Sequence, residues 1–158
     1  MNTCGKRTAV ISALIFVIAA GVILLTVLNP FKSRKITDFE TVTVRESGMR
    51  SSVEYEIVRD GEEAVVSLYT ILYNSEADER RLEKSAVVSA PEVIDKLTEV
   101  GLLAWDGFHG AHPRNVSDGT MFTLDAVVNG GKRIHADGSE NFPRHYREFI
   151  RWIMDKLN

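Results

Sequence analysis

Two histidines in a glycine-rich segment are the first residues whose side chains suggest chemistry. His109 and His112 are separated by two residues, and Asp106 and Asp118 lie nearby in the sequence. Two imidazoles and a carboxylate could bind zinc, but a catalytic zinc site needs three convergent ligands on a rigid frame. Because a glycine-rich loop provides no such frame, we favour an exposed loop here. We expect no metal and no cofactor.

Histidines and carboxylates later in the chain offer general acid–base chemistry. His135 or His145 could act with Asp125 or Asp137 if the fold brings such a pair within hydrogen-bond reach. We expect both histidines to face solvent, because each lies off the apolar pattern of its segment. Ser139 lacks the G-x-S-x-G pattern of a nucleophile elbow. We therefore assign no catalytic residue, and an envelope hydrolase that uses a histidine–carboxylate pair is the alternative function.

Aromatic residues beside the first histidine pair suggest a different role, partner binding. Aromatic side chains are over-represented at the energetic centres of protein interfaces. For the tryptophan itself, we favour packing in the core beneath the preceding helix and keep partner binding as the alternative. The predicted partner-binding residues, within an irregular segment from 106 to 119, are Trp105, Asp106, Phe108, His109 and His112.

The segments that must position these residues begin with strands. Residues 39–88 alternate polar and apolar side chains and are rich in Val, Ile, Tyr and Thr, which is typical of strands. Asp60-Gly61 is a strong hairpin signal. The strand at 64–73 has apolar residues at both its odd and its even positions, so we expect it inside the sheet. A fourth strand follows at 82–88.

Two helices and a second hairpin complete the predicted domain. Ser89-Ala90-Pro91-Glu92 is a capping box that predicts a helix from 90 to 100. A hairpin pairs 121–128 with 132–136, and the apolar stripe of 142–157 predicts a last helix capped by Asn141. The expected fold class is α+β, an antiparallel sheet of about six strands covered on one face by two helices, after an N-terminal transmembrane helix.

The transmembrane prediction rests on residues 8–28, which form an apolar run of 21 residues without a charge. A helix of that length spans the roughly 30 Å core of a bilayer. A cleaved signal peptide is the rival interpretation, but its apolar region is only about 7 to 15 residues long. Because the apolar run continues to Leu28, we favour an uncleaved single-pass anchor.

The charges that flank the apolar run nearly cancel, so they do not determine orientation. A short tail before the helix is typical of a signal-anchor, with the amino terminus in the cytoplasm. The domain beyond the anchor has 17 basic residues, the 19 of the whole chain without Lys6 and Arg7, against 22 acidic ones. This acidic balance disfavours nucleic acid as a partner. The predicted divisions are a cytoplasmic tail at 1–7, the anchor at 8–28, a juxtamembrane linker at 29–37 and an extracytoplasmic domain at 38–158.

The second half of the domain contains Trp105-Asp106-Gly107-Phe108 and two further characteristic stretches, residues 118–124 and 138–143. Through these stretches, about residues 93–155 resemble a domain of membrane-anchored proteins and lipoproteins from Gram-positive gut bacteria. The resemblance implies a bacterial cell-surface address and no catalytic residues. This chain departs from the lipoproteins because its only cysteine, Cys4, precedes the apolar run.

These observations predict a membrane-tethered extracytoplasmic binding domain without enzymatic activity. The expected partners are the membrane, through residues 8–28, and a protein or envelope polymer of the cell surface. The expected location is the cell membrane, with the C-terminal domain outside.

Overall fold

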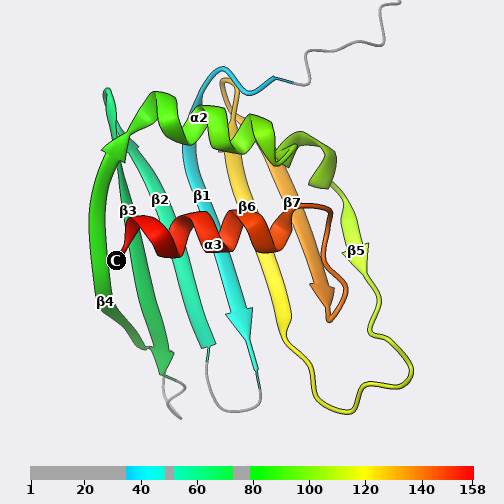
Figure 1. The fold of residues 1–158 in the computed structure, drawn as a ribbon. Helices are drawn as coiled ribbons and strands as arrows, with labels where there is room; N and C mark the ends of the chain where they lie inside the picture. The colour runs from blue at the N-terminus through cyan, green and yellow to red at the C-terminus, as the bar shows by residue number, and fades with distance from the viewer. Residues whose placement is uncertain (1–34, 49–51, 73–78) are drawn as a thin grey trace, which may run out of the picture. The chain divides into compact units, whose positions relative to one another are not determined.

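The computed structural model describes residues 35–48, 52–72 and 79–158, which form a seven-stranded sheet with two α-helices (Figure 1). The strand order is β4-β3-β2-β1-β6-β7-β5. The strands are β1 Phe39–Ser47, β2 Ser52–Asp60, β3 Glu63–Leu72, β4 Glu79–Ser89, β5 Phe108–Gly110, β6 Met121–Val128 and β7 Lys132–Ser139. The helices are α2 Ala90–Glu99 and α3 Tyr146–Lys156, with a 3-10 turn, η1, at Leu102–Trp105.

The prediction of about six antiparallel strands was wrong, because the sheet has seven strands and one of them is parallel to its neighbour. The additional strand is β5, which pairs with β7 inside the segment predicted to be irregular. Only three residues long, β5 is too short to show a period-two pattern. It packs closely because neither Gly110 nor Gly138, which face each other in the pairing, carries a β-carbon.

Both helices lie across the same face of the sheet in Figure 1. Helix α2 begins as the capping box predicts, since the Ser89 hydroxyl accepts a hydrogen bond from the backbone N–H of Glu92. It ends before Gly101, whose φ of 73° is left-handed. The core between helices and sheet contains Val44, Ile57, Leu124, Leu97 and Phe149, all 1 % exposed or less.

Helix α3 starts four residues later than the predicted start at Phe142. Residues 142–145 instead form a turn, in which the N–H of Tyr146 donates to the carbonyl of Pro143. The Phe142 ring stacks on Tyr146, 5.0 Å between ring centres, and also contacts Phe122 at 5.3 Å. Phe142, which fits the helical spacing of the apolar stripe, thus lies in the connection before α3. Its burial comes from packing against Phe122 of β6 and not from a place in the helix.

The chain enters the domain beside the β6–β7 turn. The Asn129 side-chain oxygen accepts hydrogen bonds from the backbone N–H groups of Thr37, at 2.8 Å, and Asp38, at 3.3 Å. Its amide nitrogen donates to the carbonyl of Lys35. Ile36 is fully buried and donates its N–H to Thr98 of α2. The folded unit therefore includes Ile36 and Thr37, which the sequence analysis placed in the linker.

The predicted anchor at residues 8–28 and the tail at 1–7 lie outside the described residues. Among the helices that the structure describes, none has the length and apolar character needed to span a membrane.

Candidate functional site

The sheet face opposite the helices, to which all seven strands contribute, is here called the open face (Figure 1). Residues paired directly across neighbouring strands share a face, so the register identifies its members. One row crosses all seven strands and contains His109, Asp137, Thr123, Arg45, Glu54, Tyr69 and Leu82. The adjacent row contains His135, Asp125, Thr43, Glu56, Ser67 and Ser85.

The open face also carries most of the exposed large apolar side chains of the described residues. Of five such side chains, Val58, Leu82, Val87 and Met121 lie on this face by register, and Leu72 does not. Their exposed fractions run from 38 % to 61 %. The open face therefore combines exposed apolar side chains with polar ones.

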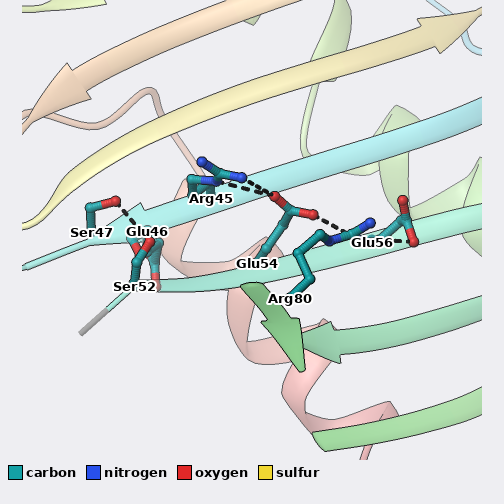
Figure 2. A network of polar contacts seen from close by, with 7 residues as sticks. All are labelled: Arg45, Glu46, Ser47, Ser52, Glu54, Glu56 and Arg80. Atoms are coloured by element: carbon teal, nitrogen blue, oxygen red, sulfur yellow. Dashed lines mark hydrogen bonds and ion pairs between the residues drawn. The ribbon is translucent and has the colours of Figure 1, made fainter. Parts of the chain in front are cut away.

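A cluster of two arginines and two glutamates organises one half of the open face (Figure 2). The Glu54 side chain, only 8 % exposed, lies between Arg45 and Arg80. Arg45 donates through Nε and Nη2, at 3.1 and 3.0 Å, to one oxygen of Glu54. Arg80 Nη2 lies 2.6 Å from the other oxygen and 3.4 Å from Glu56, and its guanidinium lies 4.0 Å from the centre of the Tyr69 ring. These contacts fix long side chains from β1, β2 and β4.

We expect Arg80→Ala to destabilise the protein by about 1 to 3 kcal/mol, because Glu54 then keeps only Arg45 as a cationic partner while its carboxylate stays buried. The half-exposed guanidinium keeps the effect below that of a fully buried pair. Arg81→Ala is the matched control, since Arg81 pairs with Glu83 on an exposed surface. Denaturant unfolding measures both variants. Equal losses would contradict the role of the buried carboxylate.

The other half of the open face carries two histidine–carboxylate pairs. His109 Nδ1 lies 2.7 Å from Asp137, and His135 Nδ1 lies 2.8 Å from Asp125. The second nitrogen of His135 is 3.9 Å from Asp137. The structure thus brings together residues from both sequence-predicted sets, but all four side chains are at least 38 % exposed. Because water solvates these exposed side chains, their surroundings do little to favour proton transfer between histidine and carboxylate.

His135 should titrate above its ordinary range. The hydrogen bond to Asp125 raises the pKa of His135 and is the largest cause; desolvation opposes it, and the charges of Asp125, Asp137 and Asp106 act in the same direction as the hydrogen bond. A raised folded-state pKa stabilises the fold below about pH 6.5, and that contribution is lost as the pH rises through the folded-state pKa. An NMR titration of the His135 ring should give a pKa above 6.5, and Asp125→Asn should lower it. An unchanged value in Asp125→Asn would contradict the assigned cause.

The remaining predicted partner-binding residues have different surroundings. Trp105 is 2 % exposed, its indole N–H donates to the carbonyl of Arg144, and its ring lies 6.0 Å from Phe149. It therefore packs in the core. Asp106 lies 3.8 Å from Lys132 and near the backbone of His135, while Phe108 is half-buried on β5. His145 is the N-cap residue of α3, where it contacts Glu148.

His109 and His112 line a shallow groove of about 250 Å³ on the open face, here called the histidine groove. His112 Nδ1 lies 2.8 Å from the Ser139 hydroxyl, and His112 Nε2 lies 2.7 Å from the carbonyl of Val116. No three His, Cys, Asp or Glu side chains of the described ranges are placed to hold a metal ion. The full lining is His109, Gly110, Ala111, His112, Met121, Phe122, Thr123, Asp137, Gly138 and Ser139.

A second cleft, of about 270 Å³, lies on the helix side between the end of β1 and the start of α3. The Tyr146 hydroxyl donates to Glu46 at 3.0 Å. Burial raises the pKa of Glu46, and the hydrogen bond from Tyr146 and the charge of Arg147 partly oppose that shift. Burial raises the pKa of Tyr146 as well. Sequence reasoning missed this pair, since 100 residues separate its members and neither belongs to a motif.

No family model matches the chain, and no curated protein and no solved structure is significantly similar to it. The resemblance to a domain of Gram-positive surface proteins therefore stays a prediction, and the functional argument rests on the chain's own geometry.

Proposed function

We propose that this protein is a membrane-tethered extracytoplasmic domain that binds a protein or polymer of the cell envelope through its open face. The apolar residues 8–28 would be the tether. The observation that carries the proposal is the composition of the open face, which combines ordered ion pairs with four exposed apolar side chains. This proposal moves the binding surface from the 105–112 segment to the sheet, because Trp105 is buried and the exposed histidines lie on the open face.

The shape of the open face supports a macromolecular ligand. The histidine groove on the open face is shallow and of only about 250 Å³, below the small end of the range for small-molecule sites. The cleft on the helix side, of about 270 Å³, also falls below that range. A larger depression of about 680 Å³ lies at the sheet end around Phe39 and Arg59, but it is wide open to solvent. A protein or polymer ligand can instead distribute its contacts over several strands of the open face.

Site-specific photo-crosslinking in cells tests the binding face in the full-length protein. A photoreactive residue at Thr43 lies at the centre of the open face, and one at Asp155 lies on the exposed side of α3 as the matched control. We expect a discrete adduct from position 43 and none from position 155. Identical adducts from both positions, or none from position 43, would contradict the proposal.

Protease shaving of intact cells tests the address. With a tag at the C-terminus, we expect external protease to remove the tag, and alkaline carbonate to leave the protein in the membrane fraction. A protected tag would invert the proposed topology, and release by carbonate would exclude the tether.

A further inference from the structure

Ser139 and His112 have the geometry of a nucleophile with its base. The Ser139 hydroxyl lies 2.8 Å from His112 Nδ1, and the opposite ring nitrogen lies 2.7 Å from the carbonyl oxygen of Val116. A peptide carbonyl can only accept a hydrogen bond, so Nε2 carries the hydrogen in the neutral ring. Nδ1 is then the bare nitrogen and accepts the hydrogen bond from Ser139. A hydroxyl, a base and a third group that orients the base are the elements of an activated nucleophile.

We propose that the histidine groove is an esterase site in which Ser139 is the nucleophile and His112 the general base. This activity goes beyond the proposed binding role and does not depend on it. The serine is held rigidly, since it ends β7 and pairs with Met121 of β6. The close approach of Gly138 to Gly110 and Asn141 fixes the strand next to the serine.

The groove indicates the substrate class. Its volume of about 250 Å³ accommodates a short acyl chain, and Ala111, Met121 and Phe122 provide apolar lining. His109 lines the same groove and contacts Asp137 through Nδ1, which leaves Nε2 as the ring nitrogen available to a ligand. A solvent-exposed base and an open groove give little electrostatic stabilisation to an oxyanion. Activated carboxylic esters are therefore the expected substrates, ahead of the less reactive amides.

The reaction balances with water as the only co-reactant. Ser139 Oγ attacks the ester carbonyl carbon while His112 Nδ1 takes the hydroxyl proton. Collapse of the tetrahedral adduct breaks the bond to the alcohol oxygen, which receives that proton from His112. Water then attacks the acyl-serine, with His112 again as base, and releases the carboxylic acid. The proton returns to Ser139, so that the hydroxyl and the neutral imidazole are restored.

The test measures p-nitrophenyl acetate hydrolysis and fluorophosphonate labelling on the full-length protein in detergent. We expect labelling at Ser139, located by peptide mass spectrometry, and none in Ser139→Ala. We expect His112→Gln to lower the hydrolysis rate about 100-fold or more while keeping the circular dichroism spectrum. The pH–rate profile should rise with deprotonation of one imidazole, and this dependence should disappear in His112→Gln.

Matched controls separate this site from adventitious reactivity. Ser117→Ala changes an exposed serine in the segment between β5 and β6, which also contains His112. His145→Gln changes a histidine at the start of α3. Both variants should hydrolyse the ester at the wild-type rate. Labelling at other serines, an unchanged rate in His112→Gln, or no hydrolysis above that of buffer would overturn the proposal. None of these results bears on crosslinking at Thr43, so the two proposals fail separately.

Discussion

Trp105→Ala is expected to destabilise the protein by about 3 to 5 kcal/mol, the range for deleting a large buried aromatic side chain. Trp105 is 2 % exposed and its ring lies 6.0 Å from both Tyr146 and Phe149. Its removal leaves a cavity between η1 and α3 and also leaves the Arg144 carbonyl without the indole N–H. Denaturant unfolding followed by circular dichroism measures the loss, which corresponds to a fall in Tm of about 10 °C or more.

Two further variants separate packing from hydrogen bonding at this position. Trp105→Phe keeps a ring but removes the N–H donor, so it should cost less than Trp105→Ala. Trp152→Ala removes a half-buried tryptophan that stacks on Phe149 from the outer part of α3, and it should also cost less. If Trp105→Ala were no more destabilising than Trp152→Ala, core packing of Trp105 would be contradicted and a partner contact would become its better interpretation.

Gly138→Ala is expected to destabilise the protein by about 1 to 3 kcal/mol through overpacking. A β-carbon there would overlap the carbonyl oxygen of Asn141 and lie 2.8 Å from the Phe122 ring and 3.1 Å from the Gly110 α-carbon. Two of these neighbours are backbone, which cannot move aside by changing a rotamer. The strain should therefore separate β5 from β7.

The effect of Gly138→Ala should be local as well as global. Since His109 pairs with Asp137 across the β5–β7 junction, amide exchange in residues 108–110 should accelerate in the variant. Thr123→Ala, an exposed change on the neighbouring strand β6, should alter stability by less than about 0.5 kcal/mol. Unchanged amide exchange in β5 would show that the close packing of Gly110 and Gly138 does not stabilise the pairing of this strand with β7.

The parts of the fold with local chemical signals were predictable from sequence. Ser89 and Glu92 set the start of α2, and Gly101 sets its end within one residue of the prediction. The turn at residues 129–131 has positive φ throughout, which matches the Asn-Gly-Gly sequence and gives the β6–β7 hairpin. In each case the decisive interaction involves residues close together in the chain.

The overturned elements depend on partners distant in the chain. Strand β5 exists because β7 pairs with it, and the paired residues His109 and Asp137 are 28 positions apart in the sequence. No local pattern encodes that pairing. The late start of α3 follows from the packing of Phe142 on Phe122. A periodic sequence records which residues are buried, but it does not distinguish burial in a helix from burial in a turn.

The candidate site has the same division. The sequence singled out His109, His112 and His135 by residue type. The strand register places Asp137 beside His109 and Asp125 beside His135, and the segment that follows β5 brings His112 to Ser139. The sequence did not predict that Glu54 is buried, because a glutamate at a polar position of an alternating strand is expected to face solvent. The side chains of Arg45 and Arg80 bury it, and such long side chains reach across strands in ways that alternation does not encode.

The contacts of Asn129 have a mechanical consequence. Its side chain joins the incoming backbone at residues 35–38 to the β6–β7 turn, and β1 then continues between β2 and β6, hydrogen-bonded on both sides. A pulling force applied at the amino-terminal end would therefore load the middle strand of the sheet and not a peripheral one. Extraction of β1 would require many backbone hydrogen bonds to break together, so the domain should resist tension from that end.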